Sequence, residues 1–369
     1  MEERRLIIQV KGTEPVIDYV IGNNKHVKYY DTQFRVAGLA VESIVKRSIE
    51  IKKEEARNKV SGIHDNLIHN IIPFIGERGV GKTSALISFA NILREYEGET
   101  NEYLNFGNDK DIRFTCLNSI DGSLLEQGED IFKVILAQMY LEFDKVSKEA
   151  RRRWDAEINH SGDDKKLRNE FQELYKKLIH LNGDEREKAL IGLVSPLESL
   201  QWLSSSLDLK KDFERIIKLY LSVMSELSSR TRYSESSVCN SAKHFLVVVI
   251  DDLDLNINNG YEMLEKLHRY VMLPNVIILL AVDLKQLTRL CEKHFYDMTP
   301  LVDSKLNDQS DVISQLAQDY LNKVMPYHFR VHMPNFGSSG TMIDDEDNRK
   351  PDNTLPSTKE AIFNLLSAK

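Results

Sequence analysis

The sequence predicts an α/β fold in which helices cover both faces of a parallel β-sheet. Short, fully apolar runs recur along the chain, which is typical of strands that are buried on both faces. Segments with apolar residues at every third or fourth position, typical of amphipathic helices, separate these runs. Strands that alternate with helices in this way favour a parallel sheet.

The composition excludes several classes of protein. The chain has 369 residues, of which 41% are hydrophobic and 29% charged, as in ordinary soluble domains and unlike collagen or disordered chains. A formal net charge of −8 argues against a nucleic-acid footprint over the whole chain. No apolar run approaches the roughly 20 residues of a membrane span, and the start lacks the apolar core of a secretory signal. We therefore expect a cytoplasmic protein with no membrane segment.

The first part of the chain is predicted to alternate strands and helices. Turn residues at 12–15 separate two short strands, and charged residues end the first long helix. The predicted elements are strands at 5–10 and 16–21, a helix at 34–59, a strand at 71–75, a helix at 84–95, a strand at 112–117 and a helix from 131 to about 143.

The character of the chain changes at residues 145–230, where charges dominate, glycine is rare and apolar residues recur at helical spacing. We interpret this region as a helical insertion. The predicted elements after it are strands at 245–250, 276–282 and 327–333, and helices at 261–272, 284–294 and 312–324.

These elements suggest a division of the chain. The segment 336–358 is rich in Gly, Ser, Asp, Asn and Pro, which predicts mobility, and a helix that starts at 359 is cut off at the chain end, as in the front part of a longer protein. The predicted units are N-terminal strands and helix at 1–65, a first core part at 66–144, the helical insertion at 145–240, a second core part at 241–335, and a linker with the start of a C-terminal helical region at 336–369.

A glycine-rich turn between the strand at 71–75 and the next helix fits the phosphate-binding (Walker A) motif G-x-x-x-x-G-K-S/T in full. Its amides can form an anion nest at a helix N-terminus, with Gly79 and Gly81 in backbone conformations closed to other residues. A turn that only caps a helix is the alternative, which the strand, helix and Lys-Thr pair disfavour. The predicted nucleotide-binding residues are Gly76, Glu77, Arg78, Gly79, Val80, Gly81, Lys82, Thr83 and Ser84.

The apolar run 245–250 ends in two acids, Asp251 and Asp252, as in a Walker B strand. Ligands of parallel α/β sheets bind at the carboxyl ends of the strands, so both acids are expected beside the phosphate loop. Asp251, with Thr83, is predicted to hold Mg²⁺. Asp252 is predicted to orient or deprotonate the attacking water, and Lys82 to act with it in catalysis. A solvated strand-end turn is the alternative when the acids are considered without the loop.

Four further residues are weaker candidates for contacts with the nucleotide. Asp283 ends the strand at 276–282, where it could sense the γ-phosphate or cap the next helix. Lys323, Arg330 and Arg269 are candidates for a cation that reaches the nucleotide of a neighbouring subunit, with solvated surface charge as the alternative.

The sequence Ile250-Asp251-Asp252-Leu253-Asp254 resembles the IDDLD signature of KAP P-loop ATPases, which are related to AAA+ and STAND proteins. The apolar strand that ends at Asp283, and the segments 320–324 and 329–331, are similar to other elements of that group. Two positions differ, because Leu255 follows the third Asp where Arg is usual and Asn322 replaces the usual acid. The resemblance implies a parallel-sheet P-loop NTPase of the ASCE type, here with an all-helical insertion, with ATP and Mg²⁺ as cofactors.

We therefore expect a Mg²⁺-dependent ATPase that works as a homo-oligomer with a partner protein or effector enzyme. Bacterial proteins of the KAP group include the ATPase subunit of the RADAR anti-phage system, so the resemblance also implies a role in phage defence. A slowly hydrolysing switch or scaffold is one alternative, and a small-molecule kinase is disfavoured by the absence of an Arg-rich lid. A DNA-associated motor is another alternative, but acids interleaved with the basic residues 151–153 favour a solvated helix face.

Overall fold

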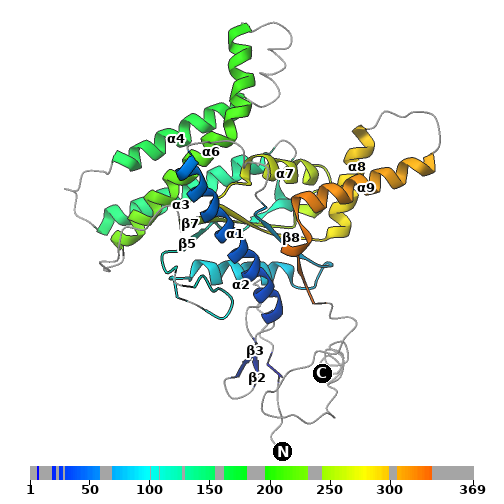
Figure 1. Cartoon of the computed structure of the whole chain (residues 1–369), viewed down its shortest axis with the longest axis horizontal. Helices are drawn as coiled ribbons and strands as arrows, with labels where there is room; N and C mark the ends of the chain where they lie inside the picture. Colours follow the sequence, from blue (N-terminus) through cyan, green and yellow to red (C-terminus); the bar gives the residue numbers. More distant parts are fainter. Residues whose placement is uncertain are drawn as a thin grey trace, which may run out of the picture.

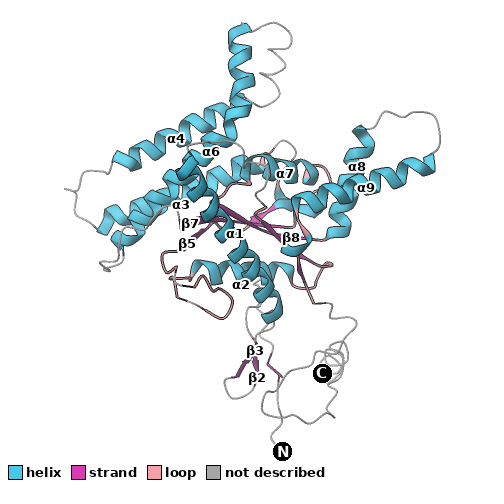
Figure 2. Ribbon diagram, viewed as in Figure 1, coloured by secondary structure: helices cyan, strands magenta, loops and turns pink. Residues whose placement is uncertain are grey.

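A parallel β-sheet forms the centre of the molecule, as Figures 1 and 2 show. Its strands are ordered β5-β7-β8-β4-β9, with the short β6 paired to β7, and every pairing within it is parallel. The predicted α/β fold with a parallel sheet is therefore confirmed. The strands are β4 (Ile71–Ile75), β5 (Arg113–Cys116), β6 (Ile120–Asp121), β7 (His244–Asp251), β8 (Val276–Val282) and β9 (Val331–His332).

This structure is a computed structural model. The predicted linker at 336–358 and the helix from 359 lie outside the described residues. The structure describes residues 6–7, 19–21, 25–27, 30–58, 69–99, 101–107, 109–126, 129–153, 162–180, 196–231, 243–298 and 306–334.

The central strands are apolar because both of their faces are covered. All residues of β4, β7 and β8 are buried, and successive side chains enter two different hydrophobic clusters. In β7, Leu246, Val248 and Ile250 enter one cluster, whereas Phe245, Val247 and Val249 enter the other. The period of two expected for a strand thus distributes each apolar run over both faces of the sheet.

Helices pack on both faces of the sheet (Figures 1 and 2). Helices α1 (Asp31–Asn58) and α2 (Lys82–Arg94) cover one face. No helix among the described residues has the length and apolar character that crossing a bilayer requires. The other face is covered by α3 (Ile131–Arg153), α4 (Gly162–His180), α6 (Pro196–Thr231), α7 (Gly260–Lys266), α8 (Leu284–Met298) and α9 (Leu306–Val324).

The region predicted as a helical insertion is helical wherever the structure describes it. Its helices share the hydrophobic cluster of one sheet face, where the rings of Phe132 and Phe213 lie 4.5 Å apart. The predicted end of a helix at about Phe143 is wrong. Helix α3 continues to Arg153, because Val146 and Ala150 extend its apolar stripe into the same cluster.

Other predicted elements need correction. The N-terminal strands β1 (Leu6–Ile7) and β2 (Tyr19–Ile21) are joined by an unpredicted antiparallel strand, β3 (Lys25–Val27). The predicted strand at 327–333 begins with a 3₁₀ turn, since Phe329 N–H bonds to the Pro326 carbonyl at 3.0 Å. The helix predicted at 261–272 ends in a π-helical turn. The helix predicted at 284–294 is α8, which extends to Met298, and the helix predicted at 312–324 is α9, which begins earlier, at Leu306.

Candidate nucleotide site

The glycine-rich turn leaves the carboxyl end of β4 and leads directly into α2. Gly79 and Gly81 have φ angles of 85° and 84°, so the prediction that both need glycine backbone conformations is confirmed. Gly81 is the N-cap residue of α2, and the Gly76 amide donates to the Val282 carbonyl of β8 at 3.3 Å. Glu77 is exposed, as are the next two residues of the turn. The turn therefore presents its backbone to solvent at the positive end of a helix.

Lys82 lies inside this turn. Its ammonium donates to the carbonyls of Gly76 at 3.0 Å and Glu77 at 3.2 Å, and the residue is only 8% exposed. The side chain thus folds back over the turn instead of extending into solvent. A positive charge held there can bind the oxygens of an anion seated on the loop amides.

Thr83 and Asp251 meet across the site. The Asp251 carboxylate accepts the Asp252 N–H at 3.0 Å, and the nearby Thr83 hydroxyl lowers its pKa. Burial raises the pKa of Asp251, the Thr83 hydroxyl opposes this shift, and the charges of Asp252 and Asp121 add to it. A second acid beside a buried carboxylate creates a site that favours a cation.

These oxygens fit Mg²⁺, which prefers hydroxyl and carboxylate oxygens and keeps several waters or phosphate oxygens as its other ligands. Thr83 and Asp251 are therefore the residues that could hold it. No group of three or more His, Cys, Asp or Glu side chains in the described part of the chain is arranged to hold a metal by itself. The donor set fits a cation that is bound together with a phosphate group.

Asp252 occupies an unusual backbone conformation. Its φ of 50° makes it the one non-glycine residue with positive φ in the described ranges, and this conformation costs about 1 kcal/mol or more. A 3₁₀ turn (Leu253–Leu255) follows directly, and the Leu255 N–H donates to the Asp252 carbonyl at 3.1 Å. Asp252 itself is half-buried. The positive φ and the 3₁₀ turn thus make a bend directly after β7.

Asp254 is buried directly after this bend. The sequence predicted no separate role for it beyond its place in the signature at 250–254. Asp254 is 2% exposed, and the nearby Asp283 N–H lowers its pKa. Its Oδ1 has no hydrogen-bond partner among the described residues. Burial raises its pKa to about 6, although the charge of Lys82 lowers it. A buried carboxylate with an unsatisfied oxygen in the electrostatic field of Lys82 is a functional candidate, because structural cores rarely leave such groups unpaired.

Asp121 is a second residue that the motif analysis missed. The pairing of β6 with β7 places Asp121 opposite Asp251 at the carboxyl edge of the sheet. The Asp121 carboxylate accepts hydrogen bonds from the Ser123 amide at 2.9 Å and hydroxyl at 2.6 Å. The sequence signal for this position was the pair Ile120-Asp121 in an otherwise polar stretch. A pair of residues is too short to predict a strand.

Asp283 is the N-cap residue of α8, the alternative role considered for it. Its carboxylate accepts the Lys285 N–H at 2.9 Å and the Gln286 N–H at 3.4 Å, while its own N–H lies near the Asp254 carboxylate. Lys285 in turn pairs with Glu77 of the phosphate loop at 3.0 Å. The backbone of Asp283 thus lies at the edge of the site, whereas its side chain caps α8.

Asp283→Ala is accordingly expected to lower the free energy of unfolding by about 1 kcal/mol, because the first turn of α8 loses its cap. Thermal or urea unfolding measures this loss. Asp283→Asn, which can still cap, is the matched control and should stay close to wild type. A hydrolysis defect in the Asn variant that exceeds any change in stability would instead favour the γ-phosphate sensor role.

The structure does not bring the three candidate cations to this loop. Arg330 donates to the Met325 carbonyl at 2.9 Å and to the Asn322 amide oxygen at 2.8 Å. Arg269 pairs with Glu265 at 2.5 Å, and Lys323 is exposed. A contact between any of them and a neighbouring subunit stays a prediction.

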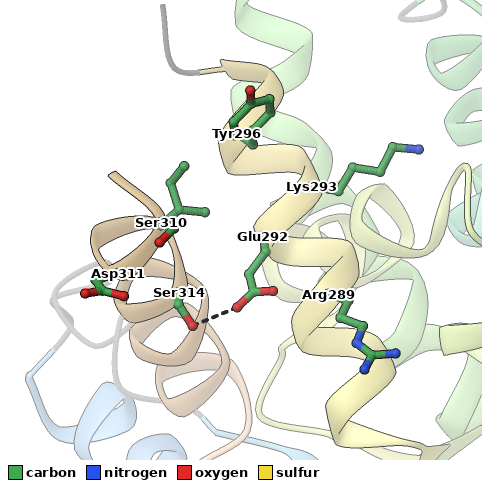
Figure 3. Close-up of a pocket in the computed structure, with 8 residues that line it drawn as sticks. Arg289, Glu292, Lys293, Tyr296, Ser310, Asp311 and Ser314 are labelled. Atoms are coloured by element: carbon green, nitrogen blue, oxygen red, sulfur yellow. Dashed lines mark hydrogen bonds between the residues drawn. The ribbon is translucent and has the colours of Figure 1, made fainter. Parts of the chain in front are cut away.

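A separate open groove of about 530 Å³ lies between α8 and α9 (Figure 3). Its polar lining includes the hydrogen bond from the Ser314 hydroxyl to Glu292 at 2.7 Å. None of the predicted site residues lines it. The groove is therefore distinct from the nucleotide site at the carboxyl edge of the sheet.

Comparison with known proteins identifies the family. No curated protein sequence matches the chain significantly. The model of the KAP family P-loop domain matches residues 69–338, which is well over half of the chain and includes the phosphate loop and both acidic strand ends. The chain therefore belongs to the KAP family of P-loop NTPases.

Proposed function

We propose that this protein binds ATP with Mg²⁺ and hydrolyses its β–γ phosphoanhydride bond. The observations that carry this proposal are the Thr83 hydroxyl near the Asp251 carboxylate and the ammonium of Lys82 held inside the same phosphate loop. The three groups supply a cation and a metal-ligating hydroxyl at the N-terminus of α2 and a metal-ligating carboxylate at the carboxyl end of β7. That is the set which phosphoryl transfer requires, since its transition state needs charge neutralisation more than covalent help.

Each residue has a distinct task in this mechanism. The amides of the loop hold the phosphate chain, and Lys82 neutralises charge on the β- and γ-phosphates. Thr83 and Asp251 would hold Mg²⁺, which would supply further charge neutralisation to the phosphate oxygens. Asp252, and Asp254 behind it, orient the attacking water toward the γ-phosphate. No Asn/Thr-Lys-x-Asp element for guanine is evident in the sequence, which favours ATP over GTP.

Phosphate release from ATP and GTP, with Mg²⁺ and with a chelator, tests the proposal. Hydrolysis of ATP that requires Mg²⁺ is the expected result. Label from γ-³²P-ATP should appear as free phosphate, because a kinase would transfer it to an acceptor. Tight ATP binding without measurable turnover would contradict hydrolysis and favour the slow switch.

We also propose that the protein acts as a homo-oligomer with a partner protein in anti-phage defence. This part is supported by the KAP family membership, since the resemblance described above places a bacterial defence ATPase in that group. Mass photometry with and without a non-hydrolysable ATP analogue should show a larger particle with nucleotide. Phage plaque counts on cells with and without the intact operon test the cellular role, and equal counts across a broad phage panel would remove it.

A further inference from the structure

The residue that precedes α1 lies directly against the phosphate loop. A Cβ atom placed on Gly81 would lie 2.3 Å from the phenolic oxygen of Tyr30 and 3.4 Å from the ring carbon that bears it. Tyr30 is only 6% exposed. The phenol therefore covers the one face of the Gly81 backbone on which any other residue would carry its side chain.

A column of aromatic rings connects Tyr30 to both elements that flank the loop. The Tyr30 ring lies 5.8 Å from Phe34 of α1, and Phe34 lies 5.8 Å from Phe89 of α2. Phe89 in turn lies 6.0 Å from Phe74 of β4. Because β4 enters the loop and α2 leaves it, α1 is packed against both ends of the nucleotide-binding turn. Such ring pairs contribute beyond simple area burial.

A second connection passes through the end of β9. Gln33 of α1 donates to the His332 carbonyl at 3.1 Å, and the Met333 N–H donates to the Ile75 carbonyl at 2.8 Å. A Cβ on Gly76 would lie 2.9 Å from the Met333 Cβ, so Met333 covers the first glycine of the loop. One end of the loop is thus backed by Tyr30, which directly precedes α1, and the other by Met333, which follows the residue that is hydrogen-bonded to α1.

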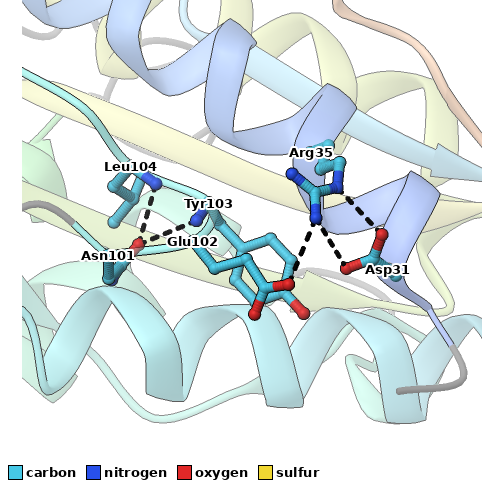
Figure 4. Close-up of polar contacts among 6 residues, drawn as sticks. All are labelled: Asp31, Arg35, Asn101, Glu102, Tyr103 and Leu104. Atoms are coloured by element: carbon cyan, nitrogen blue, oxygen red, sulfur yellow. Dashed lines mark hydrogen bonds and ion pairs between the residues drawn. The ribbon is translucent and has the colours of Figure 1, made fainter. Parts of the chain in front are cut away.

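The first turns of α1 are also held by contacts with the segment 101–107 (Figure 4). Arg35 pairs with Asp31 at 2.8 Å and with Glu102 of the segment 101–107 at 3.1 Å. A Cβ on Gly38 would lie 1.9 Å from the Tyr103 carbonyl oxygen, so the helix backbone packs directly on that segment. The helix can therefore act as a rigid support for Tyr30.

We propose that Tyr30 is a positioning residue of the nucleotide site, which holds the Gly81 backbone and its neighbouring amides in the phosphate-binding conformation. Tyr30 and α1 precede residue 69, where the family match begins, so this support comes from outside the matched residues. The inference rests on the proposed binding of ATP at the loop. It implies that displacement of α1 weakens nucleotide binding without any change to the loop sequence.

The full chain with Tyr30→Phe tests the proposal, with Tyr103→Phe as the matched control. The Tyr103 ring packs on the same Phe34 at 5.5 Å, but it belongs to the segment 101–107. Titration with a fluorescent ATP analogue should show affinity about fivefold weaker for Tyr30→Phe and near wild type for Tyr103→Phe, with similar melting temperatures for both. Deuterium uptake by the peptide at 76–84 should rise only in Tyr30→Phe.

Two outcomes would overturn the proposal about Tyr30, and a third would remove the function on which it rests. Equal affinities and equal exchange at 76–84 for both variants would show that the phenol does not act on the loop. Loss of affinity together with faster exchange along the whole of α1 and a lower melting temperature would show a general packing role. Failure of the wild-type chain to bind the analogue would instead remove the proposed function on which the inference rests.

Discussion

Replacing Lys82 by alanine is expected to reduce ATP hydrolysis by at least about a hundredfold. Lys82 is 8% exposed, and its ammonium lies within 3.2 Å of two loop carbonyls, whereas Arg78, the other cation of the loop, is exposed. Its loss removes charge neutralisation that strengthens in the transition state. Phosphate release at saturating ATP measures the effect on turnover.

Lys285→Ala is the matched control for this experiment. Lys285 also contacts the loop, through Glu77, but its side chain is 78% exposed and exposed ion pairs contribute little. Hydrolysis by this variant should stay within about twofold of wild type. Undiminished phosphate release by a correctly folded Lys82→Ala protein would refute the assignment of the site.

Replacing Asp254 by asparagine is expected to make the protein more stable and less active. The pKa of the folded carboxyl is raised from an ordinary 3.8 to about 6, chiefly by burial. Between these pH values the folded state binds more protons than the unfolded state, so stability falls as pH rises through this window. At pH 7 the charged carboxylate therefore costs up to about 3 kcal/mol, which the neutral amide avoids.

The activity of the same variant should fall by at least about tenfold, because an amide cannot accept a proton or orient water as a carboxylate does. Urea unfolding at pH 4, 6 and 7.5 and phosphate release give the two readouts. Asp252→Asn serves for comparison, since this half-buried residue should lose activity without gaining stability. An Asp254→Asn protein that is less stable at pH 7.5 than wild type, or equally active, would contradict this account of the residue.

The loop and its acids could be predicted from the sequence because local spacing alone defines them. The motif at 76–83 needs only a strand before it and a helix after it, and fully apolar runs indicate buried strands such as β7 and β8. Helix ends were less predictable. The end of α3 at Arg153 depends on the packing of Ala150 in a cluster shared with distant helices, which the local pattern does not contain.

The residues that were missed depend on long-range or backbone geometry. Asp254 reaches the site because Asp252 adopts a φ of 50°, a conformation that no side-chain pattern indicates. Asp121 gains its position from register with β7, which is more than a hundred residues away in sequence. Tyr30 meets Gly81 only because α1 folds back across the sheet face. A stable site thus combines a local motif with supports drawn from the whole fold.

The most direct measurement is a crystal structure of the full chain with a non-hydrolysable ATP analogue and Mg²⁺. The account predicts the triphosphate on the amides of residues 76–83, with Lys82 turned from the loop carbonyls toward the phosphates. It also predicts the metal beside Thr83 and Asp251. Nucleotide bound elsewhere, for example in the groove between α8 and α9, with the loop empty would contradict it.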